Sequence, residues 1–124
     1  MPLIQIRYNR IKISPAVLTR LSITLPRFAS ELLSCEEGGR LSPQDIMIEA
    51  DEFNSNWGNV NCKDLHVRVI AHDYPSRRGE KLDIARDVLA AKVMLALESE
   101  NSNASWYVWV LLSLTSYKSD TDSG

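Results

Sequence analysis

The chain has 124 residues, of which 44% are hydrophobic and 24% charged, a balance that fits one compact domain and argues against disorder. Its formal net charge of −2 and sequence pI near 5.6 argue against a nucleic-acid-binding protein, which usually carries a basic surface matched to phosphates. No apolar stretch approaches the roughly 20 residues of a membrane-spanning helix, and no export leader is recognised, so we expect a cytoplasmic protein without a membrane partner.

The first half of the chain is predicted to form a strand, a helix and a second strand. Residues 2–8 alternate between apolar and polar side chains, as strands do. Ser14 followed by Pro15 supplies a helix cap and a proline at the first helical position, and apolar residues continue at helical spacing. Residues 45–53 predict the second strand, which leads into a turn-rich segment.

Two details of this first helix follow from its proline and glycine residues. Pro26 removes one backbone hydrogen bond, so we expect a kink there rather than a division into two helices. Gly38 and Gly39 can adopt the left-handed conformation that closes a helix, and we expect the helix to end near them.

The same order is predicted again in the second half. Residues 65–74 form a strand, Ser76 caps a long helix, and residues 106–114 are rich in β-branched and aromatic residues, as a buried strand should be. One face of this helix is expected to face the core, with Ala85 and Leu89 beside it. That face consists of Ile84, Val88, Ala91 and Leu95.

These elements predict an α+β fold made of two β-α-β units, with halves at residues 2–62 and 63–118 of one domain and a polar tail at 119–124. Each crossover should make the two strands of its half parallel. The result is a four-stranded mixed sheet with both helices on one face. The other face is left bare and carries large apolar side chains, so self-association is expected.

Several residues together resemble the tautomerase superfamily, in which an amino-terminal proline is the catalytic group. The matching positions are Pro2, Gln5, Ile6, Glu52, Asn56, Trp57 and Gly58. The doubled unit is similar to the longer members of the branch that includes 4-oxalocrotonate tautomerase and macrophage migration inhibitory factor. The resemblance covers roughly residues 2–115 and implies a homotrimer that acts on a small 2-oxo acid without a cofactor.

An amino-terminal proline can act as a base, and Pro2 is therefore a candidate catalytic residue. When Met1 is removed, the proline nitrogen becomes a secondary amine, and α-amino groups titrate at about 7.7–8.0 in water. Burial and nearby cations would lower the pKa toward neutrality, which suits a base that moves a proton between carbons. The plain alternative is an ordinary proline at the start of a strand.

The resemblance also implies cations for the substrate carboxylate and the developing enolate oxygen. The corner after the third predicted strand supplies Arg77 and Arg78, and the segment before the second strand supplies Arg40. The end of the first strand supplies Arg10 or Lys12. Trp57 would form a wall of the proline pocket. The plain alternative for each single cation is a solvated surface charge, and for Trp57 a hydrophobic anchor.

Some features depart from the family pattern and leave other interpretations open. Met47 occupies the place of a second arginine, and residues 59–61 replace a glycine pair. These departures bear on the substrate and not on the fold. Cys35 and Cys62 lack the spacing of a zinc site, and no metal site is expected. The alternatives are a non-catalytic relative with a structural or interaction role and a ferredoxin-like binding module.

Overall fold

The computed structural model describes residues 2–53 and 63–114, which form the predicted order of strand, helix and strand in each half of the chain. The elements are β1 (Leu3–Tyr8), α1 (Pro15–Leu33), β2 (Met47–Glu52), β3 (Leu65–His72), α2 (Glu80–Ser99) and β4 (Trp106–Ser113), with short 3-10 turns η1 (Pro43–Asp45) and η3 (Pro75–Arg77). The predicted boundary at residue 118 and the polar tail lie outside the described residues.

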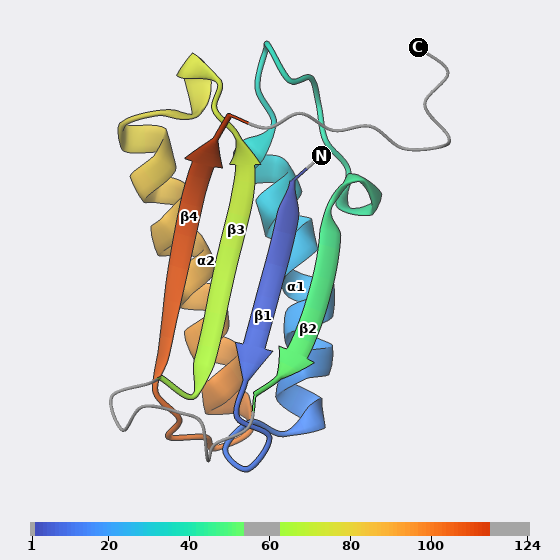
Figure 1. The fold of residues 1–124 in the computed structure, drawn as a ribbon, viewed down its shortest axis with the longest axis vertical. Helices are drawn as coiled ribbons and strands as arrows, with labels where there is room; N and C mark the ends of the chain where they lie inside the picture. The colour runs from blue at the N-terminus through green and yellow to red at the C-terminus, as the bar shows by residue number, and fades with distance from the viewer. Residues whose placement is uncertain (1, 54–62, 115–124) are drawn as a thin grey trace.

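The sheet has the strand order β2-β1-β3-β4, and both helices cover the same face of it (Figure 1). β1 is parallel to β2 and β3 is parallel to β4, whereas the two central strands β1 and β3 are antiparallel. The predicted α+β class, the mixed sheet and the parallel pairing within each half are therefore confirmed. Of the helices described, none carries an apolar stretch of membrane-spanning length.

Alternation along the central strands builds the core. Ile4 and Ile6 of β1 and Leu65, Val67 and Val69 of β3 are at most 2% exposed. Because side chains alternate across a strand, these residues share the face that the helices cover. Helix α1 contributes the stripe Val17, Leu21, Leu25 and Ala29, all fully buried.

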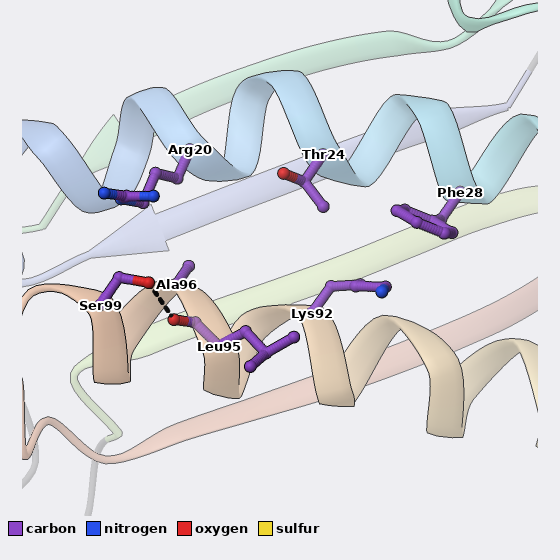
Figure 2. A pocket seen from close by; sticks show the side chains of 7 residues that line it. All are labelled: Arg20, Thr24, Phe28, Lys92, Leu95, Ala96 and Ser99. Atoms are coloured by element: carbon purple, nitrogen blue, oxygen red, sulfur yellow. Dashed lines mark hydrogen bonds between the residues drawn. The ribbon is translucent and has the colours of Figure 1, made fainter.

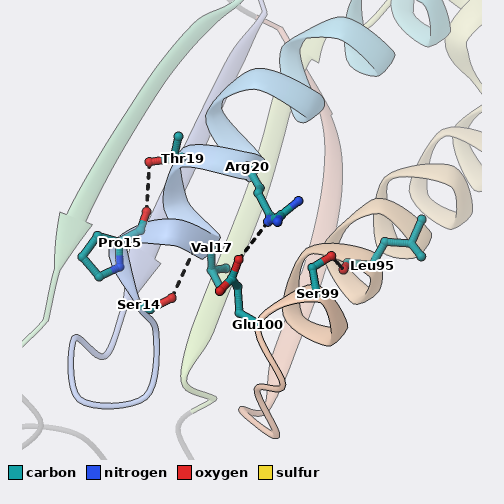
Figure 3. Close-up of polar contacts among 8 residues, drawn as sticks. All are labelled: Ser14, Pro15, Val17, Thr19, Arg20, Leu95, Ser99 and Glu100. Atoms are coloured by element: carbon teal, nitrogen blue, oxygen red, sulfur yellow. Dashed lines mark hydrogen bonds and ion pairs between the residues drawn. The ribbon is translucent and has the colours of Figure 1, made fainter.

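Helix α1 begins as predicted and ends earlier than predicted. The Ser14 side chain accepts a hydrogen bond from the Val17 backbone at 3.3 Å, which caps the helix (Figure 3), and α1 continues through Pro26 as one helix. It ends at Leu33, however, because Ser34 adopts an extended conformation. Gly39 does have a positive φ of 79°, but it serves a separate tight turn after the helix.

Helix α2 begins later than predicted and buries a different face. Ser76 lies in η3 and is not its cap, since the residue before the helix is Gly79 with a φ of 69°. The face packed on the sheet consists of Ala85, Leu89, Val93, Ala96 and Leu97. The expected core positions Ile84 and Leu95 are instead 47% and 54% exposed. The prediction of this face was wrong by roughly one residue step around the helix, about 100°.

The open face of the sheet is only partly apolar. Residues paired across the strands point to the same side and form rows. The first row is apolar and consists of Met47, Leu3, Ile70 and Leu111. The next row consists of Glu49, Gln5, Arg68 and Trp109, and the third of Asp51, Arg7, His66 and Tyr107. The expected large apolar side chains are therefore present, but they share this face with charged and aromatic ones.

Candidate active site

Pro2 lies directly before β1 and is buried. Its carbonyl oxygen accepts a hydrogen bond from the Met47 backbone at 3.0 Å, which fixes it against the start of β2. Continuing the strand register by one residue sets Pro2 between Ile46 and Ala71, which are 6% and 2% exposed. The surroundings of Pro2 are therefore apolar, as an amine of reduced basicity requires.

Arg77 lies at the Pro2 end of the sheet, but it is 5% exposed and its guanidinium is hydrogen-bonded within the chain. Its Nε donates to the Leu33 carbonyl oxygen at 2.8 Å, and its Nη1 donates to the His72 carbonyl oxygen at 3.0 Å. The guanidinium also lies over the Tyr74 ring, 4.9 Å from its centre. These contacts satisfy the last carbonyl of α1 and join the two halves of the chain.

Arg78 is exposed and forms a two-point ion pair with Asp73. Nε and Nη2 donate to the two carboxylate oxygens at 2.7 and 3.0 Å. The hydrogen bond from Arg78 is the main reason that the pKa of Asp73 is lowered, and the same bond raises the pKa of Arg78. The guanidinium is thus held in a fixed orientation, with Nη1 directed away from this bidentate contact.

A second contact ties the same corner to the loop before β2. Both the backbone amide and the hydroxyl of Ser76 donate to the Glu37 carboxylate. The hydroxyl bond is the largest cause of the lowered pKa of Glu37. Gly38 packs so closely there that an added Cβ would lie 2.8 Å from the Tyr74 ring. The loops of the two halves are therefore held together beside the Pro2 end of the sheet.

Arg40 lies in this first loop and is exposed. It lines an open cavity of about 690 Å³ between the carboxyl end of α1 and η1. The other lining residues are Arg27, Ser30, Glu31, Ser34, Leu41, Ser42 and Pro43. Pro2 does not line this cavity. The position of Arg40 is therefore weaker support for substrate binding beside Pro2 than the position of Arg78.

The turn after β1 is not brought to Pro2 within one chain. Lys12 lies in the turn after β1, where its backbone amide bonds to Asn9, and β1 separates this turn from Pro2 by roughly 20 Å. Arg10 lies in the same turn and approaches Glu52 at 4.0 Å. Trp57 lies outside the described residues.

Ser113 is a polar residue at the Pro2 end that the sequence did not single out. It pairs with His72 at the end of β4, and its hydroxyl is the one buried side-chain group in residues 2–53 and 63–114 without a hydrogen-bond partner. A buried hydroxyl without a partner is costly, so it is suited to a bond with a ligand or a neighbouring chain. No sequence signal distinguishes it from an ordinary serine at a strand end.

A continuous set of ring contacts crosses the open sheet face. His66 stacks between Phe53 and Tyr107, with ring centres 5.3 and 4.7 Å apart. The Arg68 guanidinium donates to the Tyr107 hydroxyl at 3.1 Å and lies over the Trp109 ring. Desolvation is the main cause of the lowered pKa of His66. Such aromatic and arginine side chains are typical of protein interfaces.

The described residues contain no cluster of three or more His, Cys, Asp or Glu side chains placed to hold a metal ion. The arrangement that they do offer is a buried proline at a strand start, with two cationic loops and a hydroxyl at the same end. These groups are suited to proton transfer and carboxylate binding.

Comparison with known proteins shows the fold. No protein-family model and no curated protein matches the sequence. Among solved structures, a fused 4-OT wild-type symmetric trimer matches with a TM-score of 0.65 and 13% identity, over 96% of this chain and 92% of that one. A macrophage migration inhibitory factor-like protein from Entamoeba histolytica matches with a TM-score of 0.60 and 10% identity, over 94% and 95%. A 5-carboxymethyl-2-hydroxymuconate delta-isomerase matches with a TM-score of 0.58 and 12% identity, over 100% and 89%.

Proposed function

We propose that this chain, which has the tautomerase-superfamily fold, is an isomerase that moves a proton within a small unsaturated 2-oxo acid. Pro2 is the general base, acting through the secondary amine that removal of Met1 creates. The observation that carries the proposal is the burial of Pro2 at the end of the sheet where the two arginine-bearing loops meet. The similarity of the fold to a protein named as a 5-carboxymethyl-2-hydroxymuconate delta-isomerase supports the reaction class.

Each group has a role that follows from its place. The Pro2 amine takes a proton from the carbon next to the carbonyl, or from the hydroxyl of the enol form, and returns it to another atom of the same substrate, which is a tautomerisation. Arg78 binds the substrate carboxylate through Nη1 and the outer side of Nη2, while Asp73 holds its orientation. Arg77 fixes the loop that carries Arg78, and Arg40 contributes positive charge from the first loop.

The proposed assembly is a homotrimer formed through the open face of the sheet. The apolar row on this face and its aromatic and arginine contacts supply an interface, and neighbours of the same fold are described as trimers. Lys12 belongs to a Pro2 pocket only if a neighbouring subunit supplies it, and Trp57 is proposed as a wall of the same pocket. A cytoplasmic location remains a prediction from the sequence.

Turnover of the enol of phenylpyruvate, or of 2-hydroxymuconate, tests the proposal when it is followed by ultraviolet absorbance. The expected result is measurable ketonisation by protein whose intact mass shows the loss of Met1. The Arg78→Gln variant should raise KM, because it removes charge that binds the carboxylate. Equal KM values for the two proteins would contradict the assigned role of Arg78.

A second candidate function is a non-catalytic role as a structural or interaction protein. The observation that favours it is that both arginines of the corner are engaged within the chain, Arg77 with backbone carbonyls and Arg78 with Asp73. If this alternative holds, no 2-oxo acid is turned over even when Met1 is absent. Retention of Met1 in protein isolated from its natural source would also favour it.

A further inference from the structure

Ser113, the last residue of β4, has a buried hydroxyl group. In the described part of the chain, it is the one buried side-chain group without a hydrogen-bond partner. A serine in a helix can bond to the carbonyl oxygen one turn before it, as the Ser99 hydroxyl does to Leu95 at 2.6 Å (Figure 2). A strand side chain stands away from the carbonyl groups of the sheet and has no such partner. A molecule that binds beside Ser113 would supply the missing hydrogen bond.

Ser113 lies at the level of the Pro2 nitrogen. The register of β1 and β3 continues with Pro2 opposite Ala71, and the nitrogen lies on the side of Pro2 that faces away from β1. That side is level with His72, which pairs with Ser113. Two strand spacings, about 10 Å in all, separate β1 from β4. A small acid that lies along this edge of the sheet can therefore reach from the proposed base toward Ser113.

The backbone of Ser113 is bonded to the residue that holds Arg78. The Asp73 amide donates to the Ser113 carbonyl oxygen at 3.0 Å. The Asp73 carboxylate accepts hydrogen bonds from Arg78 at 2.7 and 3.0 Å. The hydroxyl and the guanidinium are thus positioned through the same residue. In a 2-oxo acid the oxo group is on the carbon next to the carboxylate, so a donor beside the carboxylate-binding cation is placed for the 2-oxo oxygen.

The 2-oxo oxygen is the atom on which negative charge develops in a tautomerisation. Loss of a proton from the neighbouring carbon, or from the enol hydroxyl, leaves an enolate at this position. A hydroxyl donor bonds more strongly to an enolate oxygen than to a neutral carbonyl oxygen, and it therefore lowers the barrier more than it strengthens substrate binding. The Ser113 hydroxyl is already removed from water in the free protein, so its own desolvation adds no cost when substrate binds.

We propose that Ser113 is a catalytic residue whose hydroxyl donates a hydrogen bond to the 2-oxo oxygen of the substrate. This inference rests on the isomerase function proposed above for the Pro2 site. Ser113 keeps its own proton, because Pro2 carries the proton that is transferred. Arg78 binds the carboxylate and Ser113 the adjacent oxygen, so the two residues together distinguish a 2-oxo acid from a simple carboxylic acid.

Ketonisation of the enol of phenylpyruvate tests the proposal in proteins whose intact mass shows the loss of Met1. Removal of one donor to a developing oxyanion typically lowers kcat by roughly 10²–10³-fold, and we expect a loss of at least about tenfold in Ser113→Ala with little change in KM. Ser113→Thr keeps a hydroxyl and should recover most of the activity. An unchanged kcat in Ser113→Ala overturns the role of Ser113 alone. Absence of turnover by the wild type overturns the proposed function as well.

Stability and assembly separate this role from a structural one. Ser113→Ala removes a hydroxyl that has no partner in the described chain, so its Tm should equal or exceed that of the wild type. Ser105→Ala is the matched control, because the Ser105 hydroxyl, directly before β4, donates to the Asp64 carboxylate at 3.1 Å. This control should lower the Tm and leave kcat unchanged. A lower Tm or a smaller assembly mass in Ser113→Ala would assign its hydroxyl to folding or to a subunit contact, against the proposal.

A competitive inhibitor identifies the oxygen that Ser113 contacts. The probe is 3-phenylpropanoate, which has the carboxylate of phenylpyruvate but no 2-oxo oxygen. Its inhibition constant should not rise in Ser113→Ala, whereas it should rise several-fold in Arg78→Gln. A higher inhibition constant in Ser113→Ala would show that the hydroxyl binds the carboxylate, and the assignment to the 2-oxo oxygen would then be wrong.

Discussion

The Nε of Arg77 donates a hydrogen bond to the backbone carbonyl oxygen of Leu33 at a distance of 2.8 Å. Leu33 ends the helix of the first half of the chain, whereas Arg77 lies in the turn before the helix of the second half. This bond, together with the one from Nη1 to His72, makes a buried side chain the link between the two β-α-β units.

Replacement of Arg77 by methionine should lower the free energy of unfolding by about 3 kcal/mol. The apolar stem would be kept, but two buried carbonyls would lose a charged donor, and hydrogen bonds to charged groups contribute roughly 1.5–3 kcal/mol each. Urea denaturation measures the change. Arg78→Met is the matched control, and it should change stability little because its ion pair is exposed. Similar losses in the two variants would contradict the structural role of Arg77.

The contact between Glu37 and Ser76 predicts a dependence of stability on pH. The pKa of Glu37 is lowered from its ordinary value of 4.5, so its carboxylate stabilises the folded state above that pH. This contribution is lost as the pH falls below 4.5 through the folded-state pKa. The Tm of the wild type should therefore exceed that of Glu37→Gln at neutral pH, and the difference should shrink in acid. Glu36→Gln, at an exposed neighbouring position, should show no such trend.

The two sides of α2 predict different costs of truncation. Leu89 is fully buried, so Leu89→Ala should lower the free energy of unfolding by about 2–5 kcal/mol through lost burial and a cavity. Met94 is 45% exposed, and Met94→Ala should cost less than about 1 kcal/mol. Chemical denaturation of both variants checks the assignment. A larger cost for Met94→Ala would mean that α2 is rotated relative to the arrangement described.

The apolar row on the open sheet face predicts where a trimer is disrupted. Leu111 is 38% exposed at the end of this row, and Leu111→Lys would place a charge in the proposed interface. We expect this variant to lose the threefold assembly in light scattering while its circular dichroism is unchanged. Ser22→Lys, at an exposed position on the helix layer, should leave that threefold assembly intact. A trimer that survives Leu111→Lys would exclude this face as the interface.

The strands were predictable because their signal is local. Alternation of buried and half-buried side chains along Leu65–His72 is visible in the sequence, and the crossover lengths then determine which strands are parallel. The face of α2 was not predictable in the same way, because this helix has apolar residues on two sides. Only packing against the sheet selects Leu89 over Leu95 as the core residue.

The residue at which α1 ends and the burial of Arg77 both depend on long-range contacts. Glycines after a helix indicate a left-handed turn, and Gly39 does adopt one, but the sequence does not show that Ser34 ends the helix first. Similarly, an arginine pair in a loop suggests exposed charge. The burial of Arg77 arises from Leu33 and Tyr74, and only the folded chain brings Leu33 beside it. The same limit applies to Ser113, whose unpaired hydroxyl is a property of its packing.

The most direct test of the account is the rate of 2-hydroxymuconate ketonisation by wild type and Pro2→Ala, both confirmed by intact mass to have lost Met1. Pro2→Ala keeps an amino-terminal amine, but it is a primary amine that no proline ring holds in position, so part of the roughly 10²–10⁴-fold contribution of a positioned general base should be lost. We predict that kcat/KM falls by at least about tenfold in Pro2→Ala, while the circular dichroism spectrum and assembly mass stay unchanged. Equal kcat/KM values in the two proteins would contradict the assignment of Pro2 as the base.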